Sequence, residues 1–398
     1  MPTRRLLLAA GVATLAAPAL ALAAPAHRPA APKKTEPATP GDTPLGPVDT
    51  VARWAYITDF NTGATLFDKA AEERMPPSSM TKMMTQYIVY SMLASGRLKL
   101  DQQLPVSEKA WRKQGSKMFV PLDGLVTVQD LILGVVVDSG NDAAIVLAEG
   151  ISGSEDQFVD LMNAQARKFG LRNTHFMNCT GWPADDHYSC ARDIATIAIH
   201  LIRDYPQYYH FDSETQFTYD KIKQQNRNAL VWRHLADGLK TGHTDAGGYG
   251  LCASSLRGGR RVVIVLNGMP TSRDRDGEGV RLMGWAFVQF EDVVLFSAAD
   301  TVDNAPVYLG AQPSVPLVAG HDVLLTMPRS WLQTAKVTVD YASPVPAPVA
   351  RGQVLGKLSI AGQGVPPTEV PLLAGADVPR LSLPGRALAV LSHYVTGS

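Results

Sequence analysis

Cysteine is scarce in this chain of 398 residues. Only Cys179, Cys190 and Cys252 are present, and none of them forms a Cys-x-x-Cys pair. Structural zinc sites and disulfide frameworks use more thiols at closer spacing, so the sequence argues against both. We predict three buried free thiols, with a single disulfide as the alternative.

An excess of charge is also missing. The 37 Lys and Arg residues balance the 37 Asp and Glu residues, which gives a formal net charge of zero. The composition therefore offers no argument for nucleic-acid binding. The chain is longer than one typical domain, and 45% of its residues are apolar, as is usual in globular proteins. We expect two globular domains.

The first 24 residues have the pattern of an export signal. Arg4 and Arg5 precede an apolar run over 6–22, and Ala21-Leu22-Ala23 is a small-x-small cleavage sequence. A single-span membrane anchor is the alternative, but the run is short and ends in Pro25. The arginine pair is compatible with twin-arginine export and with plain Sec export. We predict an exported protein.

Residues 25–47 are rich in Pro, Ala, Lys and Thr. Such a segment buries little apolar surface, so we predict a flexible linker. Folded sequence is expected from near Val51. Apolar residues in 52–57 and 65–67 flank Asn61-Thr62-Gly63, which predicts two strands joined by a turn.

The next segment, from Pro76 to Gly96, predicts a helix. Two prolines lead to Ser78, a candidate N-cap, and apolar residues then recur at helical spacing. Ser79 and Lys82 are three residues apart, so they share one face of this helix. A serine hydroxyl needs a base to become a nucleophile, and a poorly solvated lysine can accept its proton. One helical turn therefore holds a candidate nucleophile and base, although Ser-x-x-Lys also occurs by chance.

The rest of the chain indicates two kinds of domain. Helical patterns dominate 101–212, and strand patterns return at 248–255 and 261–268, before a closing helix over 279–290. Strands at both ends of the domain, with helices between, predict one sheet covered by helices. From about Phe296, short apolar runs are divided by Gly and Pro, which predicts a small all-β domain.

Three motifs fall within the first domain: Ser79-Met80-Thr81-Lys82, Ser139-Gly140-Asn141 and Lys240-Thr241-Gly242. In isolation, the second is also typical of a helix end and the third of a turn. Together and in this order, the three motifs resemble the signature of the penicillin-binding proteins and serine β-lactamases.

Around these motifs, the sequence resembles one group of these enzymes more closely than the others. Segments 137–143, 171–176, 225–228 and 238–245 are similar to the low-molecular-weight D-alanyl-D-alanine carboxypeptidases, close to penicillin-binding proteins 5 and 6. The similarity covers about residues 50–390. It implies an α+β protein with a β-lactamase/transpeptidase-like catalytic domain, an antiparallel sheet with helices on it, followed by a small all-β domain. The implied catalytic domain is 48–292, the β-rich domain 296–388 and the C-terminal tail 389–398.

The resemblance also implies catalytic roles. Ser79 would be the nucleophile, Lys82 its base, and Ser139 the residue that passes a proton to the leaving amine. The oxyanion hole would use the backbone N–H groups of Ser79 and His243. The expected substrate-binding residues are Asn141, Lys240, Thr241, Gly242, His243 and Arg275.

The resemblance implies that an arginine binds the terminal carboxylate of the substrate, because a planar guanidinium can form two hydrogen bonds with a carboxylate. Arg275 fits the family pattern Arg-x-x-Glu together with Glu278, and Arg273 is the alternative. The ordinary explanation is an exposed loop arginine paired with Asp274 or Asp276. The histidines without a partner motif, which we predict to be surface or packing residues, are His175, His187, His200 and His234.

Two departures from related enzymes matter. Thr180 stands where penicillin-binding protein 5 has a histidine, so a role of that histidine in deacylation does not transfer. No clear Glu-x-x-Leu-Asn segment, which bears the deacylating glutamate of class A β-lactamases, is present.

The resemblance implies a serine D-Ala-D-Ala carboxypeptidase that acts on peptidoglycan stem peptides. It would need no metal or cofactor and would be inhibited covalently by β-lactams. A β-lactamase and a non-catalytic envelope protein that binds peptide stems are the rivals. The short C-terminal tail supports at most weak peripheral binding to the outer face of the inner membrane.

Overall fold

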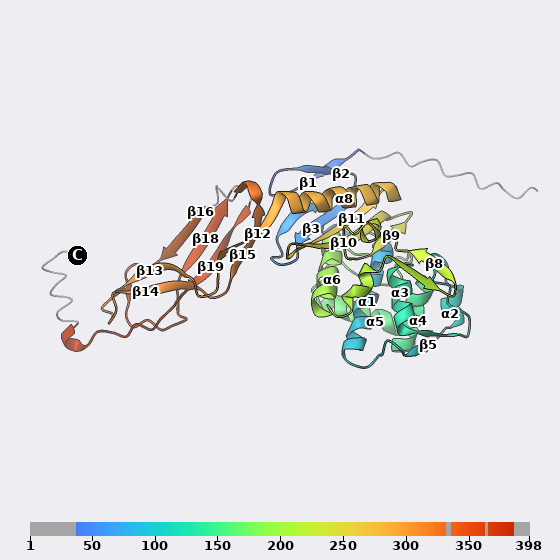
Figure 1. Ribbon diagram of the computed structural model, residues 1–398, viewed down its shortest axis with the longest axis horizontal. Coiled ribbons are helices and arrows are strands. Elements are labelled where there is room, and N and C mark those ends of the chain that lie inside the picture. Colours follow the sequence, from blue (N-terminus) through green and yellow to red (C-terminus); the bar gives the residue numbers. More distant parts are fainter. Residues whose placement is uncertain (1–36, 332–335, 363–364, 386–398) are drawn as a thin grey trace, which may run out of the picture. The chain divides into compact units, whose positions relative to one another are not determined.

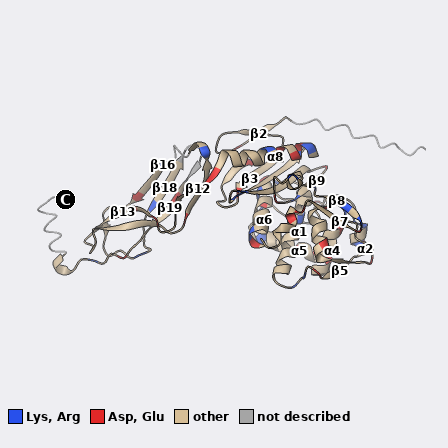
Figure 2. Ribbon diagram, viewed as in Figure 1, with Lys and Arg blue, Asp and Glu red and all other residues tan. Residues whose placement is uncertain are grey.

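The computed structural model describes residues 37–331, 336–362 and 365–385 (Figure 1). The predicted export signal at 1–24 and the predicted tail at 389–398 lie outside these residues. Among the helices in the described ranges, none is both long and apolar enough to cross a bilayer. Acidic and basic positions are interspersed along the ribbon, in keeping with the balanced composition (Figure 2).

The first domain is built on a five-stranded antiparallel sheet. Its strand order is β4-β3-β11-β10-β9, and Ile57 of β3 pairs with Ile264 of β11. Segments about 200 residues apart in the chain therefore lie side by side, which confirms the prediction of one sheet built from both ends of the domain. The strands are β3 (Trp54–Asp59), β4 (Thr65–Lys69), β9 (Thr241–Thr244), β10 (Gly248–Arg257) and β11 (Arg260–Met269).

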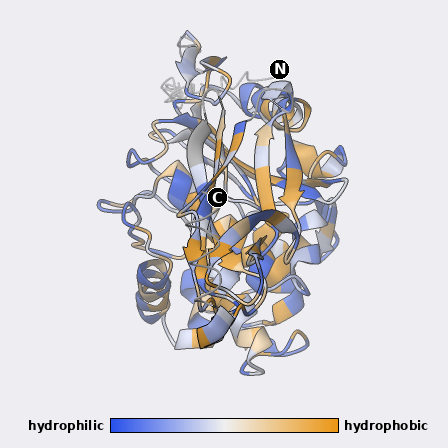
Figure 3. Ribbon diagram, turned by 90° about the vertical axis from the view of Figure 1, so that its left-hand side faces the viewer, coloured by the Kyte–Doolittle hydropathy of each residue, from blue (hydrophilic) through white to orange (hydrophobic). Residues whose placement is uncertain are grey.

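Both faces of this sheet are covered. On β11, Val263 and Val265 belong to the core under the helical layer, whereas Ile264 and Leu266 belong to the core under α8 (Ser272–Gln289). Successive strand residues point to opposite faces, so an uninterrupted apolar run is what a doubly covered strand requires. Each fully buried aliphatic side chain stabilises the fold by about 1.5–3 kcal/mol. Hydrophobic positions accordingly concentrate on strands and helices (Figure 3).

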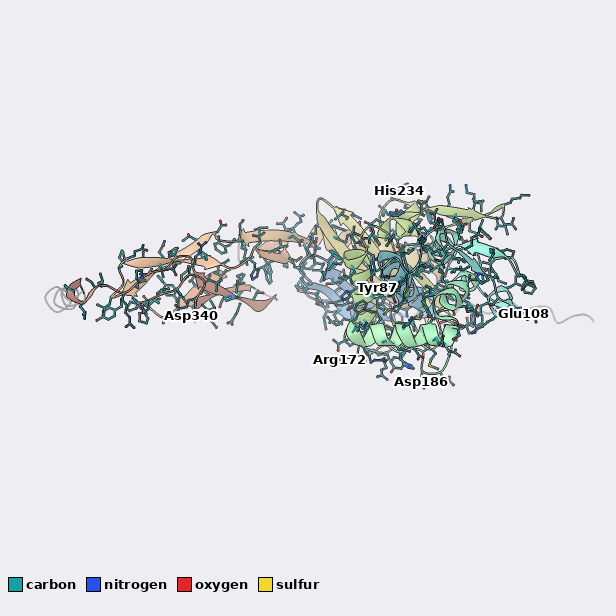
Figure 4. All side chains as sticks on the ribbon, turned by 90° about the horizontal axis from the view of Figure 1, so that it is seen from below. Tyr87, Glu108, Arg172, Asp186, His234 and Asp340 are labelled. Atoms are coloured by element: carbon teal, nitrogen blue, oxygen red, sulfur yellow. The ribbon has the colours of Figure 1, made fainter. Side chains whose placement is uncertain are left out.

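The helical layer contains the segment that was predicted to carry the nucleophile. In α1, 10 of 13 residues are buried, so this helix is a core element and its polar side chains are removed from water. Tyr87 of α1 lies among the surrounding helices (Figure 4). The helices before α8 are α1 (Lys82–Ala94), α2 (Glu108–Arg112), α3 (Val128–Val136), α4 (Asn141–Ser152), α5 (Glu155–Lys168), α6 (Ala191–Asp204) and α7 (Ala229–Trp232).

Helix α8 begins earlier than predicted. Its first residue is Ser272 rather than Gly279, because the side chain of Thr271 accepts the N–H of Asp274 and caps the helix there. The segment that was expected to be a loop is therefore the first two turns of α8.

Folded sequence also begins earlier than predicted. Strand β1 (Thr39–Gly41) pairs with β2 (Val48–Thr50), so part of the predicted linker at 25–47 is a hairpin. The Lys69 side chain attaches this hairpin to β4 by donating to the Thr39 carbonyl at 3.0 Å. Backbone groups make most of these contacts, so the composition of a Pro- and Thr-rich segment does not reveal them. Two further hairpins are β5 (Gln103–Pro105) with β6 (Leu125–Thr127), and β7 (Gln216–Tyr219) with β8 (Ile222–Gln225).

The second domain is all-β, as predicted. Its six-stranded sheet has the order β16-β18-β19-β14-β13-β17, with only β13 and β17 parallel, and Leu317, Leu358 and Leu372 are fully buried in its core. Strand β12 pairs with β15 and runs through the predicted boundary at 292–296. The strands are β12 (Phe290–Phe296), β13 (Thr301–Tyr308), β14 (Ser314–Ala319), β15 (Val323–Pro328), β16 (Lys336–Tyr341), β17 (Val345–Pro346), β18 (Val354–Gly362) and β19 (Val365–Ala374).

The three cysteines are buried and free. The prediction of free thiols is confirmed, and the alternative of one disulfide is wrong.

Candidate active site

Ser79 lies on a short 3₁₀ helix, η1 (Ser78–Thr81), that leads directly into α1. The prediction that Ser78 caps one continuous helix is wrong. Ser78 has a φ of 50°, and its Oγ contacts Thr244 Oγ1 on β9 at 3.0 Å instead of a helical N–H group. This contact fixes the turn against the edge of the sheet. Ser79 and Lys82 nevertheless share a face, with 3.0 Å between Ser79 Oγ and Lys82 Nζ.

Lys82 Nζ has three oxygen neighbours. They are Asn141 Oδ1 at 2.7 Å, the Thr180 carbonyl at 2.7 Å and Ser79 Oγ at 3.0 Å. The first two can only accept hydrogen bonds, and the Asn141 orientation is set because its Nδ2 donates to the Gln114 carbonyl at 2.8 Å. A neutral amine has two N–H groups and one lone pair. When both N–H groups are used on the fixed acceptors, the lone pair is directed at the Ser79 hydroxyl.

The surroundings of Lys82 favour this neutral form. The side chain is 0% exposed. Burial lowers the pKa of Lys82 to about 7, and the positive charges of Arg227 and Lys113 also lower it, against the opposing effect of Asp142. About half of the lysine is therefore neutral near pH 7, which is where a general base is most effective.

Ser139 and Asn141 lie at the junction of α3 and α4. Ser139 has a φ of 60°, in the left-handed region that is costly for a residue with a side chain. The Gly140 N–H donates to the Gly134 carbonyl at 2.8 Å, which ties the turn to α3. The buried Asp142 carboxylate accepts backbone N–H groups of residues 118–120, which ties the neighbouring loop to the start of α4. These bonds hold Ser139 in its strained position.

Strand β9 forms the opposite edge of the site. Because Gly242 has no side chain, this strand can lie close to the turn that bears Ser79. A Cβ at Gly242 would lie 3.0 Å from Ser78 Cβ and 3.3 Å from the Ser79 nitrogen. The turn that bears Ser79 therefore occupies the space that a side chain at position 242 would need. Gly181, directly after Thr180, also allows a close approach, since a Cβ there would collide with the Ser78 carbonyl oxygen.

Lys240, just before β9, is a buried lysine beside the cleft. It is 3% exposed, and its Nζ donates to the Thr241 carbonyl at 3.0 Å. Burial lowers the pKa of Lys240 well below its usual range, with repulsion from Lys82 and Arg227 as further causes. The nearby Asp212 offers little compensation at pH 7, because burial raises its pKa to about 8. A substrate carboxylate would stabilise the charged form of Lys240.

One cleft of about 870 Å³ brings the predicted residues together. Seven of the nine line it, and the two lysines, Lys82 and Lys240, are buried beside them. The lining residues are Ser79, Gly115, Ser116, Ser139, Asn141, Trp182, Pro183, Arg227, Thr241, Gly242, His243, Thr244, Asp245, Tyr249, Ser272 and Arg275.

Of the two candidate arginines, Arg275 lines the cleft and Arg273 does not. Arg275 lies in the first turn of α8, where its side chain is 12% exposed, while Arg273 is exposed on the same turn. The pairing of Arg275 with Asp276, the ordinary explanation from the sequence, is present at 2.8 Å. Arg275 also donates to the Arg227 carbonyl at 3.2 Å. Both contacts hold its guanidinium at the wall of the cleft.

Several residues of the site were missed by sequence reasoning. Arg227 lines the cleft and donates to the Asp138 carbonyl at 3.0 Å. The Lys113 ammonium lies 4.6 Å from the centre of the Trp182 ring, at the rim of the cleft. A Cβ at Gly115 would lie 2.7 Å from Asn141 Nδ2, so this glycine lets the loop approach the site. None of these residues belongs to one of the three motifs, so spacing alone gave no signal for them.

Thr180, where the family resemblance led us to expect a histidine, does not line the cleft. Its hydroxyl is used within its own loop, at 2.9 Å from Asn178 Oδ1 and 3.2 Å from the Trp182 nitrogen. Only its carbonyl reaches the site, where it accepts from Lys82. The side chain therefore orders the loop instead of facing the cleft.

Known proteins match both domains. The D-alanyl-D-alanine carboxypeptidase family, peptidase family S11, matches residues 41–271, and the C-terminal domain of penicillin-binding protein 5 matches residues 290–380. D-alanyl-D-alanine carboxypeptidase DacA of Haemophilus influenzae is 40% identical over 319 residues, covering 78% of this chain and 81% of that protein. The Escherichia coli K12 protein DacA is 36% identical over 341 residues, covering 83% and 85%.

Solved structures agree. The crystal structure of penicillin-binding protein 5 from Haemophilus influenzae has a TM-score of 0.73 at 39% identity and covers 83% of this chain and 98% of that chain. The D-alanyl-D-alanine carboxypeptidase DacD from Francisella tularensis has a TM-score of 0.75 at 30% identity, covering 84% and 95%. The fold, the three motifs and the similar proteins all indicate the same family. This chain belongs to the serine D-alanyl-D-alanine carboxypeptidase family, in the group that resembles penicillin-binding protein 5.

Proposed function

We propose that this enzyme removes the terminal D-alanine from peptidoglycan pentapeptide stems through an acyl-enzyme on Ser79. The observation that carries the proposal is the arrangement around Lys82 Nζ, which lies 2.7 Å from two fixed acceptors and 3.0 Å from Ser79 Oγ. In the neutral amine, this arrangement directs the lone pair at the Ser79 hydroxyl. A serine next to a base with this geometry and a pKa near 7 is an activated nucleophile.

In the acylation step, Lys82 takes the Ser79 proton while Ser79 Oγ attacks the carbonyl carbon of the D-Ala-D-Ala peptide bond. The carbonyl oxygen becomes an oxyanion, which the N–H groups of Ser79 and His243 would stabilise. The C–N bond then breaks, and the leaving nitrogen gains a proton through Ser139, which lines the same cleft. D-Alanine departs as an amine, and water later hydrolyses the ester on Ser79.

The charge of the cleft suits a substrate with a free C-terminus. Arg275 and Arg227 place positive charge at the wall of the cleft. Besides burial, repulsion from Lys82 and from these two arginines lowers the pKa of Lys240. A carboxylate would relieve this repulsion and gain charge-assisted hydrogen bonds from Arg275.

We expect Arg275→Ala to lower kcat/KM on a peptide ending in D-Ala-D-Ala by an order of magnitude or more. Charge-assisted hydrogen bonds contribute about 1.5–3 kcal/mol, which sets this scale. The loss should be much smaller on the same peptide with an amidated C-terminus. The matched control is Arg273→Ala, which removes an exposed arginine two positions away. Equal losses on both peptides would remove Arg275 from carboxylate recognition.

The reaction itself is tested by measuring free D-alanine and penicillin turnover on one enzyme sample. We expect many D-alanines to be released per enzyme molecule, while a penicillin is captured as one stable adduct per Ser79. Faster turnover of penicillin than of peptide would instead support the β-lactamase alternative. Peptide binding with neither D-alanine release nor covalent adduct would support the non-catalytic alternative.

We further propose a periplasmic location, because residues 1–24 have the pattern of an export signal. Peripheral contact of the 389–398 tail with the outer face of the inner membrane is a second part of this proposal. Both segments lie outside the described residues, and the sequence pattern alone supports their assignment.

A further inference from the structure

The loop that contains Thr180 is held in one conformation by its own side chains. We call residues 176–182 the lysine-holding loop, because the Thr180 carbonyl accepts from Lys82. Within it, Asn178 Oδ1 accepts from the backbone N–H groups of residues 180, 181 and 182, at 3.2, 2.8 and 3.0 Å. One carboxamide oxygen thus organises the turn that presents the Thr180 carbonyl.

Contacts from outside then fix this loop in the domain. Asn163 on α5 bonds both the N–H and the carbonyl of Phe176, at 2.9 and 2.8 Å. Glu155 accepts from the Cys179 N–H at 3.2 Å. These contacts join the loop to α5. They do not join it to the turn that bears Ser79 and Lys82, which we call the nucleophile turn.

Besides the Lys82–Thr180 hydrogen bond itself, two further contacts join the loop to η1 and α1. Thr85 on α1 donates to the Cys179 carbonyl at 2.7 Å. His187 bridges the other side: its Nδ1 receives the Met177 N–H at 3.1 Å, and its Nε2 lies 2.9 Å from Thr81 Oγ1. Thr81 immediately precedes Lys82, so the bridge ends next to the base.

The two contacts also determine the tautomer of His187. A backbone N–H can only donate, so Nδ1 carries no hydrogen, and Nε2 must carry it and donate to Thr81 Oγ1. The ring is 8% exposed, with the Phe176 ring edge-on at 5.9 Å. Burial, with a smaller effect of His175, lowers the pKa of His187 to about 4, so the neutral ring that this bridge requires is the form present at pH 7.

We propose that His187 is a positioning residue for Lys82, which couples the lysine-holding loop to the nucleophile turn through Met177 and Thr81. The proposal rests on the proposed role of Lys82 as the base. Without the bridge, the loop keeps the Thr85–Cys179 contact but loses its hydrogen bonds beside Lys82. The Thr180 carbonyl and the turn can then shift relative to each other, and the Lys82 lone pair loses its direction toward Ser79. Displacements of about 1 Å at a reacting group can lower a rate by about 100-fold. His187 lies outside the cleft lining, so substrate binding should be retained.

The test compares His187→Phe, which keeps a ring but no polar atom, with His187→Gln, whose amide offers one donor and one acceptor. We expect His187→Phe to lower kcat by about 10- to 100-fold with KM within about twofold. His187→Gln should recover most of this loss. His200→Phe is the matched control: His200 stacks on Phe169 and pairs with Asp204, away from the loop, and its loss should leave kcat unchanged.

A second variant keeps the test decisive if His187→Phe fails to fold. Thr81→Val removes the hydroxyl partner with little change of shape and should show the same kcat-selective loss. Combined with a folded His187→Phe, it should add little further loss, because both changes break one bridge. A normal kcat in folded His187→Phe or Thr81→Val, or a loss that appears only in KM, would overturn the proposal.

Penicillin labelling separates this proposal from the proposed function. If Ser79 is the nucleophile, His187→Phe should still be labelled one to one, only more slowly. Labelling of the unmodified enzyme at another residue would contradict the role of Ser79 itself.

Discussion

Ser79→Ala should abolish covalent labelling by a penicillin and release of D-alanine. The substitution removes the only atom of Ser79 that Lys82 Nζ approaches, and Lys82 keeps its contacts with Asn141 and Thr180. In serine hydrolases, loss of the nucleophile lowers kcat by roughly 10⁶-fold. Ser79 is half-buried, and alanine fits within the space of the serine, so the fold should be retained. Mass spectrometry after incubation with a penicillin measures the adduct directly.

The matched control for this substitution is Ser91→Ala on the same helix. Ser91 Oγ donates to the Ile88 carbonyl within α1, remote from the cleft residues, so this variant should label as the unmodified enzyme does. Thermal unfolding of both variants checks that the fold is intact. A well-folded Ser79→Ala protein that still forms the adduct would show that another residue is the nucleophile.

The proximity of the Ser79 hydroxyl and the Lys82 amine could be predicted from the sequence because it is local. Three residues of helical backbone join them, so their separation depends little on the rest of the fold. The sheet was predictable for a similar reason, since the apolar run on β11 requires cover on both faces. The second and third motifs could be placed in the same cleft only through the family resemblance.

The electrostatics of the site could not be predicted in this way, because distant segments supply them. The Thr180 carbonyl that fixes Lys82 is 98 residues away in the chain, and Asn141 is 59 residues away. His187 was expected to be a surface or packing residue, yet its neutral ring joins two segments of the site. Its partners are a backbone N–H and a threonine hydroxyl, and neither group produces a sequence motif from which the contact could be predicted.

The residues at which helices begin could not be predicted from the sequence either. Ser78 has the residue type of a cap, but a tertiary contact with Thr244 takes its hydroxyl. Thr271 is a cap that the apolar periodicity did not reveal, and it moves Arg275 from a loop onto a helix. In both cases a single hydrogen bond decides the boundary, and such a bond of about 1 kcal/mol is invisible to an average over a window of residues.

Lys82→Arg should lower the acylation rate by roughly 10²–10⁴-fold, the usual contribution of a general base. A guanidinium remains protonated at every relevant pH, so it can still donate to Asn141 and Thr180 but cannot accept the Ser79 proton. The pH dependence distinguishes this loss from a simple change of shape. In the unmodified enzyme, the pKa of Lys82 is lowered to about 7, so acylation should rise about tenfold per pH unit below pH 7 and level off above it. Lys82→Arg should stay at its low rate throughout.

Two controls identify the group responsible for that rise. Lys168→Arg, an exposed substitution in the last turn of α5, should leave both the rate and the pH profile unchanged. Asp138→Asn removes a second group that titrates in this range, since burial raises the pKa of Asp138 to about 7. If Lys82 is the base, Asp138→Asn keeps the rise toward pH 7, because only the amine must lose its proton for Ser79 to be activated. A rise that disappears in Asp138→Asn, or a wild-type rate in Lys82→Arg, would assign the proton transfer to a different residue.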